Sequence, residues 1–255
     1  MKIKSFVKAL VRSGDLPFAL AFAGKPGAAG VRSFRWRAMD FHYRPSTSDA
    51  HVAYECFLHG KRCAYASRNL PDAADVKTVV DVGSNVGASI LFWRSVYPAA
   101  RIYGFEPEPG NFAMLHRNTE KLRDVQVFNE ALGDASGEMK FIHSPGAGNE
   151  GGWSMYQRGA QGGEKAVVLP VVRGEDRMKA LGIDAIDVLK VDTEGAERVV
   201  ISGLGPRLLA NTRYVCGELH GERDFELLDT LERNGFKIGV RKNLRSVLFN
   251  FEARR

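Results

Sequence analysis

The pattern of hydrophobic positions is most regular from residue 75 onward. There, short runs of β-branched and other apolar residues alternate with segments in which apolar residues recur every three to four positions. Runs of the first kind predict buried strands, and segments of the second kind predict amphipathic helices. The expected strands lie at 78–82, 101–105, 125–128, 139–143, 167–172, 187–191, 214–219, 236–241 and 246–251. The expected helices lie at 86–97, 109–122, 175–181, 196–209 and 223–234, and Gly203 and Pro206 are expected to end or break the helix at 196–209.

This alternation of strands and helices predicts an α/β fold. We expect a doubly wound, mostly parallel sheet that is covered by helices on both faces. The last two expected strands form a closing pair, which we expect to be antiparallel. In such folds ligands bind beyond the carboxyl ends of the strands, so functional residues are sought there.

The first 74 residues follow a different pattern and are expected to form a basic N-terminal extension and cap. Residues 2–12 predict an amphipathic helix, because one face is apolar and Lys or Arg occupies the rest of its surface. Gly14 and Pro17 are expected to end this helix. Such a helix can pack on its own domain or lie on an anionic membrane, and we favour packing. Aromatic residues interleaved with arginine over 31–70 predict short strands and a helix.

Composition restricts the class of protein. The chain of 255 residues is 44% hydrophobic and 26% charged, which suits a globular domain with its own core. The three cysteines form no CxxC pair, so neither a disulfide framework nor a zinc site is expected. No apolar run reaches the roughly 18 residues that span a bilayer, and the short run at 16–23 is not interpreted as a signal peptide. We expect a cytoplasmic protein, with contact at the inner face of the membrane through residues 2–12 as an open alternative.

The net charge of +6 is concentrated at the N-terminal end. Residues 1–70 carry 12 Lys/Arg against 4 Asp/Glu, whereas the remainder carries 24 against 26. A basic segment of this kind indicates an acidic surface or ligand as its partner, and a gain in solubility explains it equally well.

The longest irregular segment lies at 144–165 and is rich in glycine, with Trp153 and Tyr156 among its residues. An irregular stretch of this length inside a compact domain predicts a lid or a disordered loop.

The most informative motif is Asp81-Val82-Gly83-Ser84-Asn85-Val86-Gly87, where a predicted strand turns into a predicted helix. Gly83 allows the backbone to turn tightly beside a ligand, and Asn85 tolerates a left-handed conformation. The helix that follows directs its amide-rich end at the ligand. The glycine spacing departs from the G-x-G-x-x-G of dinucleotide folds. The acidic residue before the turn suits a cationic or amine-bearing ligand better than a pyrophosphate.

Acidic residues follow the next two predicted strands. Glu106 closes the strand at 101–105, where a carboxylate can accept hydrogen bonds from ribose hydroxyls. Glu130 and Ala131 follow the strand at 125–128, a position that borders the base in a nucleoside pocket. There Glu130 could accept a hydrogen bond from an amino group of the base. A polar loop explains any one of these residues, so their combination with the Asp81 turn is what indicates a nucleoside pocket.

Ionisable residues also gather in the segment DVLKVDTEGAE at 187–197. Lys190 stands inside an apolar strand, and a buried charge is costly unless it is paired. Asp192 and Glu194 share its face of the strand at i+2 and i+4, so they are its expected partners. An alternative is that the glutamates of this segment only favour a helix N-terminus.

His220 follows Glu218 at the end of the next predicted strand. This end of a parallel sheet faces the ligand, and an imidazole there can act as a general base near neutral pH. A purely structural role for His220 is an equal alternative.

Together these motifs resemble the FkbM-type methyltransferases, a branch of the class I S-adenosylmethionine (SAM)-dependent enzymes. The resemblance is carried by VVDVGSNVGAS (79–89), YGFEPEPGNFAMLHRN (103–118), NEALGDASG (129–137) and DVLKVDTEGAE (187–197). It covers roughly residues 75–252, and the combination of FEP with K-x-D-x-E-G-A-E is its specific part. It implies a seven-stranded Rossmann-like domain at 75–255, preceded by the extension at 1–74.

The resemblance also implies SAM as cofactor and a role for each matched residue. The amino acid portion of SAM would be lined by Asp81, Gly83, Ser84, Asn85 and Gly87. Glu106 would hold the ribose, and Glu130 and Ala131 would border the adenine. The transferred methyl group would be faced by Lys190, Asp192, Glu194 and His220. Residues 1–74 and the segment at 144–165 would shape acceptor specificity.

The implied reaction is O-methylation of a hydroxyl on a sugar, glycan or secondary metabolite. His220, or a carboxylate of Asp192 or Glu194, would take the hydroxyl proton. A divalent metal held by Asp192, Glu194 and Glu218 is compatible with such a reaction, but no motif requires one. Two alternatives stay open: an RNA methyltransferase that uses the basic N-terminal segment, and a SAM-fold module that binds a partner without catalysis. We do not expect nucleic acid as the partner, and the sequence does not indicate an oligomeric state.

Overall fold

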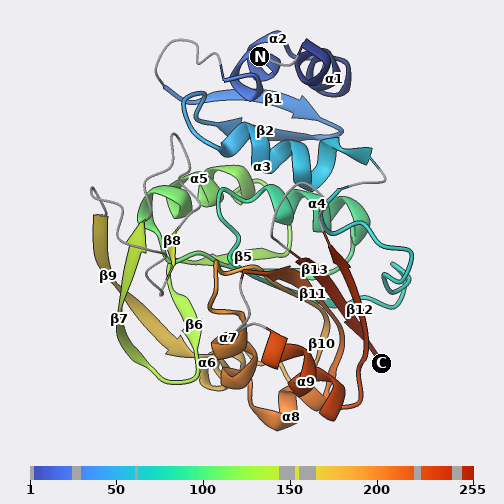
Figure 1. Cartoon of the computed structure of the whole chain (residues 1–255), viewed down its shortest axis with the longest axis vertical. Helices are drawn as coiled ribbons and strands as arrows, with labels where there is room; N and C mark the ends of the chain where they lie inside the picture. The colour runs from blue at the N-terminus through green and yellow to red at the C-terminus, as the bar shows by residue number, and fades with distance from the viewer. Residues whose placement is uncertain are drawn as a thin grey trace.

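The centre of the molecule is a seven-stranded sheet with the order β12-β13-β11-β10-β3-β4-β5 (Figure 1). The strands from β11 to β5 run parallel, and β13 is antiparallel to both of its neighbours. The computed structural model describes residues 3–24, 30–60, 63–143, 153–154, 165–220, 225–242 and 249–255. The doubly wound sheet and the closing antiparallel pair expected from the sequence are confirmed. The strands of this sheet are β3 (Thr78–Val82), β4 (Arg101–Phe105), β5 (Val125–Phe128), β10 (Ile186–Val191), β11 (Thr212–Leu219), β12 (Lys237–Lys242) and β13 (Phe249–Arg254).

Both faces of the sheet are covered, which explains why its central strands are continuous apolar runs. Successive residues of a strand point to opposite faces, so Val79 joins one buried cluster and Val80 joins the other. The first face is covered by α4 (Ala88–Val96) and α5 (Pro109–Thr119). The second face is covered by α6 (Gly174–Ala180), α7 (Glu197–Gly203), α8 (Gly205–Ala210) and α9 (Phe225–Arg233).

The N-terminal residues form a cap over α4 and α5 (Figure 1). The cap consists of α1 (Ile3–Ser13), α2 (Leu16–Phe22), β1 (Arg32–Trp36), β2 (Met39–Tyr43), α3 (Asp49–Ala53) and a π-helical turn (Tyr54–Leu58). Its buried aromatic residues, including Phe18 and Phe41, belong to the same core cluster as the residues of α4. The cap and the first face of the sheet therefore share one core. None of the helices in the described part of the chain is long and apolar enough to cross a membrane.

The helix α2 was not expected from the sequence, because Pro17 was interpreted only as the end of the preceding helix. Asp15 accepts a hydrogen bond from the backbone N–H of Phe18 at 2.7 Å and so caps a new helix. Pro17 fits the first turn of that helix, where no intrahelical donor is required. The chain therefore forms a helical hairpin here instead of one helix and a linker.

A second sheet with the order β6-β9-β7-β8 lies beside the main sheet (Figure 1). Its strands are β6 (Ala131–Gly133), β9 (Lys165–Arg173), β7 (Gly137–His143) and β8 (Trp153–Ser154). The strands at 139–143 and 167–172 were expected, but their separation from the main sheet was not. The lid or loop predicted at 144–165 lies mostly outside the described residues, as does Tyr156.

The helix expected over 196–209 is divided into α7 and α8. Gly205 has a φ of +74°, a left-handed conformation that interrupts the helix, and Pro206 then fits the first turn of α8. The break that the sequence indicated near Gly203 and Pro206 is confirmed.

Candidate active site

The carboxyl ends of β3, β4 and β10 open into a cavity of about 330 Å³ that is closed on its other side by the cap. This is the edge of the sheet at which open α/β folds bind ligands. The sequence-predicted residues that line the cavity are Gly83, Ser84, Asn85, Glu106, Glu130, Ala131, Lys190, Asp192 and Glu194. Asp81, Gly87 and His220 were also expected to face the ligands, but they lie outside this lining.

The glycine turn after β3 approaches the loop after β10 so closely that a side chain cannot fit between them. A Cβ on Gly83 would lie 1.9 Å from the backbone oxygen of Asp192, and Gly83 has a φ of +81°. Asn85 adopts the expected left-handed conformation, with a φ of 49°. The turn therefore brings the backbone at residues 83–85 and the loop at residues 192–196 to one edge of the cavity.

Glu106 stands at the end of β4 and is held by two backbone amides. One carboxylate oxygen accepts from the N–H of Asn85 at 2.9 Å, and the other accepts from the N–H of Glu108 at 3.0 Å. Burial raises the pKa of Glu106 to about 7, against the lowering effect of these two hydrogen bonds. A carboxylate in this fixed position can accept hydrogen bonds from a diol in the cavity.

Glu130 follows β5 and forms an ion pair with Arg177 of α6. The guanidinium of Arg177 also lies 4.5 Å from the centre of the Phe128 ring. Arg177 was not expected at the site, because it comes from the second-face helix α6 and not from a strand end. Its charge is next to the carboxylate that was expected to accept from an adenine amino group.

Lys190 and Asp81 form a buried ion pair beneath the cavity. Their positions are direct partners in the parallel pairing of β10 with β3, and Lys190 Nζ lies 3.2 Å from Asp81 Oδ1. Asp81 also accepts from the indole N–H of Trp93 at 3.0 Å. The expectation that Lys190 would pair with Asp192 or Glu194 was wrong, because cross-strand register places Asp81 nearer. Burial lowers the pKa of Lys190, but the charges of Asp81 and then Asp192 outweigh burial and raise it.

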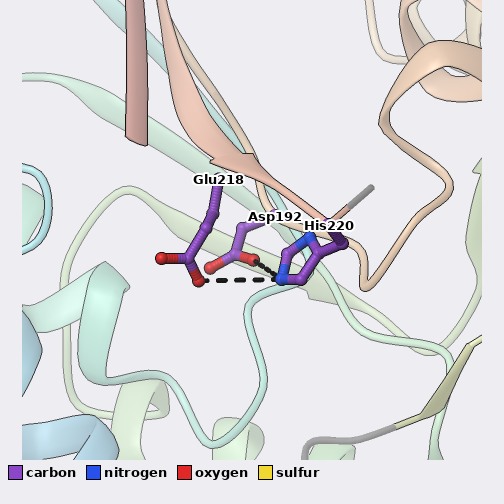
Figure 2. Close-up of side chains that lie close together, drawn as sticks. All are labelled: Asp192, Glu218 and His220. Carbon is purple, nitrogen blue, oxygen red and sulfur yellow. Dashed lines mark ion pairs between the residues drawn. The ribbon is translucent and has the colours of Figure 1, made fainter. Parts of the chain in front are cut away.

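His220 is surrounded by carboxylates at the ends of β10 and β11. Its Nδ1 lies 3.0 Å from Glu197 Oε1, and its Nε2 lies 3.6 Å from Glu194, 3.6 Å from Glu218 and 3.7 Å from Asp192. The dashed lines in Figure 2 join the Nε2 atom to the carboxylates of Asp192 and Glu218. Burial lowers the pKa of His220, but the hydrogen bond to Glu197 and the surrounding negative charges raise it to about 10. Burial, followed by the charge of Asp192, raises the pKa of Glu218 to about 8.

The cap contributes side chains to the cavity that the sequence had not singled out. Tyr65 donates its hydroxyl to Asp192 Oδ2 at 2.7 Å, although 127 residues separate the two in the chain. Glu55 and His51 also line the cavity, and burial followed by the charge of Asp192 raises the pKa of Glu55. In the sequence, only the aromatic content of the segment at 31–70 distinguished the region that contains these residues.

The electrostatic balance of this region favours a cationic ligand. The carboxylates of Glu55, Asp192, Glu194 and Glu218 all line the cavity. The ammonium group of Lys190 is paired with Asp81 below them. An excess of carboxylates in a partly buried cavity is stabilised when a positive charge enters.

The strand order and the ligand-facing glycine turn after β3 define a Rossmann-like fold of the class I methyltransferase type. The crystal structure of methyltransferase FkbM from Methylobacillus flagellatus KT shares this fold. The two match with a TM-score of 0.53 at 14% sequence identity, over 99% of this chain and 58% of that chain. The model of the methyltransferase FkbM domain matches residues 81–238, and the chain belongs to this family.

Three characterised relatives are similar to parts of this chain. The 2-O-methyltransferase NoeI of Sinorhizobium fredii is 27% identical over 58% of this chain and 65% of its own length. The 31-O-demethyl-FK506 methyltransferase FkbM of Streptomyces tacrolimicus is 30% identical over 56% of this chain and 65% of its own length. The AMB antimetabolite synthetase AmbE of Pseudomonas aeruginosa is 30% identical over 68% of this chain and 10% of its own length. The chain therefore spans less than two thirds of the length of each of these relatives.

Proposed function

We propose that this protein transfers the methyl group of SAM to a hydroxyl oxygen of a sugar, glycan or secondary metabolite. The observation that carries the proposal is a single cavity with two chemically different ends. One end has Glu106 and Glu130, which follow β4 and β5, and the other has the carboxylates of Asp192 and Glu194, which follow β10. The glycine turn after β3 lies between them. Membership of the FkbM family supports methyl transfer, and the names of NoeI and of the Streptomyces relative support a hydroxyl oxygen as acceptor.

The first end of the cavity suits the nucleoside and amino acid portions of SAM. Glu106 is positioned to accept hydrogen bonds from the ribose hydroxyls. The backbone at Gly83–Asn85 is positioned against the amino acid portion, and Glu130 and Ala131 border the adenine. When bound, SAM supplies an electrophilic methyl group on a sulfonium, whose positive charge complements the carboxylates at the second end.

The second end of the cavity suits removal of the hydroxyl proton. Asp192 and Glu194 line the cavity, whereas His220 lies behind them, so we assign the proton acceptor to one of these two carboxylates. Tyr65 fixes Asp192 by its hydrogen bond, and Nε2 of His220 lies within 3.7 Å of both carboxylates. A positioned base contributes about 10²–10⁴-fold, and alignment of the reacting atoms contributes up to about 7–11 kcal/mol.

The test is calorimetric titration of S-adenosylhomocysteine, the demethylated product of SAM, into the wild-type chain and into Glu106→Gln. We expect saturable binding in the wild type and a loss of at least about tenfold in the variant, because a hydrogen bond to a charged group contributes about 1.5–3 kcal/mol. Glu120→Gln, which changes an exposed glutamate at the end of α5, is the matched control and is expected to bind like the wild type. Absence of binding to the wild type would contradict the proposal. Binding followed by a screen of hydroxylated glycans and metabolites for methyl acceptance would identify the acceptor.

A further inference from the structure

The side chains of Asp192, Glu218 and His220 converge on one point at the edge of the sheet (Figure 2). Each offers one ligand atom for a metal, and these atoms all lie within 4.8 Å of one another. Glu218 is on β11, His220 comes directly after it, and Asp192 follows the neighbouring strand β10. Because β10 and β11 are parallel, their carboxyl ends bring the three side chains together.

The imidazole ring of His220 is held in the orientation that a metal ligand requires. Its Nδ1 is bound by Glu197, whose carboxylate also accepts from the backbone N–H of Thr193 at 2.7 Å and of Gly195 at 3.3 Å. This arrangement directs Nε2 toward Asp192 and Glu218. A histidine that binds a metal commonly donates its other ring N–H to a carboxylate in this way, and that partner fixes the ring.

The separations between the ligand atoms fit a shared cation. Nε2 of His220 lies 3.7 Å from Asp192 Oδ1 and 3.6 Å from Glu218 Oε2. Imidazole nitrogen and carboxylate oxygen atoms bind a first-row divalent cation at about 2.0–2.2 Å, which places two such ligands roughly 3–4 Å apart. The side chains therefore need little movement to bind an ion between them.

A separate observation at Glu197 points to missing positive charge. This carboxylate is completely buried, and its Oε2 atom has no hydrogen-bond partner among the described residues. Glu194 lies 3.6 Å from the same imidazole nitrogen, which adds another carboxylate to the cluster. A buried carboxylate with an unsatisfied oxygen is costly, and a divalent cation next to the cluster reduces that cost.

We propose that Asp192, Glu218 and His220 bind a divalent first-row transition-metal ion such as Mn²⁺. One imidazole and two carboxylates favour Mn²⁺, Fe²⁺, Co²⁺ or Zn²⁺ over Ca²⁺ and Mg²⁺, which prefer oxygen ligands alone. The site differs from the one that the sequence suggested, because His220 replaces Glu194 among the ligands. Binding of the ion follows from the side chains alone, whereas its role in the reaction rests on the proposed function.

In that reaction the ion binds the acceptor hydroxyl and lowers its pKa. Glu194 lines the same cavity, and its carboxylate takes the hydroxyl proton. The acceptor oxygen then forms a bond to the methyl carbon as the bond from that carbon to sulfur breaks. The electron pair of the broken bond stays on sulfur, which leaves as a neutral thioether.

The experiment is calorimetric titration of MnCl₂ into the chelator-treated full chain without SAM, together with electron paramagnetic resonance of the bound Mn²⁺. We expect one saturable site in the wild type and at least a tenfold loss of Mn²⁺ affinity in both His220→Ala and Glu218→Gln. Glu120→Gln is the matched control, because it removes an exposed carboxylate at the end of α5 but no ligand atom of the cluster. Its Mn²⁺ affinity is expected to stay within about threefold of the wild type. Circular dichroism shows which variants keep the fold.

Absence of a saturable Mn²⁺ site in the wild type overturns the proposal, as does equal Mn²⁺ affinity in the wild type and in folded His220→Ala and Glu218→Gln. S-adenosylhomocysteine is titrated separately into the metal-free wild type, so that failure of the metal site and failure of the proposed function can be told apart. Binding of S-adenosylhomocysteine without any Mn²⁺ site means that the metal proposal is wrong while the proposed function stands.

Discussion

At the scale of single residues, Asp81 and Lys190 form a buried ion pair beneath the site. Both side chains are at most 1% exposed, so neither charge is solvated by bulk water. Their attraction, the indole N–H of Trp93 and the backbone oxygens of Val82 and Gly83 replace that solvation. Such a pair contributes little net stability but makes the loss of either partner costly.

Lys190→Met is therefore expected to lower the free energy of unfolding by about 3–5 kcal/mol, because it leaves Asp81 charged and unpaired in the core. In the double variant with Asp81→Asn, the loss should be clearly smaller than the sum of the two single losses. Urea denaturation followed by circular dichroism measures all three variants. Additive losses in this cycle would contradict a direct pairing of the two side chains.

The raised pKa of Glu106, taken with its proposed role at the ribose, predicts that binding of S-adenosylhomocysteine depends on pH. In the proposed function the ionised carboxylate accepts from the ribose, and with a pKa of about 7 it becomes protonated as the pH falls through that value. Affinity should fall by about tenfold between about pH 8 and about pH 6, since a titrating group changes affinity by up to a factor of ten per pH unit. Calorimetry across this range measures the effect. The profile of Glu106→Gln should lack this component, and an identical profile in both proteins would exclude Glu106 as its source.

At the scale of elements, the site depends on two loops that touch. The turn after β3 and the loop after β10 meet at Gly83 and Asp192. The second loop is itself bent sharply, with a φ of 56° at Glu194 and 105° at Gly195. Left-handed conformations at a non-glycine residue cost roughly 1–2 kcal/mol and persist where the surrounding structure requires them. Here they allow the amides of Thr193 and Gly195 to reach Glu197.

Gly83→Ala is expected to lower the free energy of unfolding by at least about 2 kcal/mol and to weaken S-adenosylhomocysteine binding. The positive φ of this position disfavours a residue with a side chain. The added Cβ would also clash with the backbone oxygen of Asp192. Gly182→Ala is the matched control, since Gly182 has a φ of +68° but open space around its Cβ position. It carries only the backbone strain of about 1 kcal/mol. Equal losses of stability in thermal denaturation would show that the contact between the two loops is unimportant.

At the scale of the whole molecule, the cap completes the methyltransferase domain and does not stand apart from it. It closes the cavity, supplies Tyr65 to Asp192, and shares a core cluster with α4 and the first face of the sheet. The helix α1 packs on this cluster through Phe6 and Leu10, whereas Val7 and Val11 are exposed. The packing role that the sequence favoured for residues 2–12 is thus present for one face of the helix. Contact with a membrane stays a prediction.

Because the core is shared, unfolding should be a single transition even when the cap is damaged. Phe18→Ala, which empties a fully buried position in the cap, is expected to cost about 3–5 kcal/mol. Far-ultraviolet circular dichroism and tryptophan fluorescence should report the same midpoint for this variant. Val11→Ala at a position that is 76% exposed is the control and should change stability by less than about 0.5 kcal/mol. Two separate transitions would show that the cap folds as its own unit.

Local sequence patterns were sufficient to predict the strands of the main sheet and the part of the site that depends on chain neighbours. Runs of apolar residues specified the strands of the main sheet, because residues buried on both faces must be apolar. The glycine turn at 83–87 and Glu106 at a strand end were recognisable because their spacing to the preceding strand is local. The family resemblance rested on the same local segments over roughly residues 75–252, and the family is confirmed by a model that matches residues 81–238.

The tertiary structure determines which charged residues lie next to one another. Lys190 pairs with Asp81 and not with its neighbours in the chain, because the partner of a buried strand residue is set by strand order and register. Tyr65 reaches Asp192 across 127 residues, and Glu197 binds His220 from the start of α7. A sequence pattern indicates which side chains are buried. It does not indicate which distant side chain pairs with a buried charge. The part of the cavity that the cap lines is therefore specified by the folding of the cap onto the sheet, whereas the lining residues that follow strands could be predicted from the sequence.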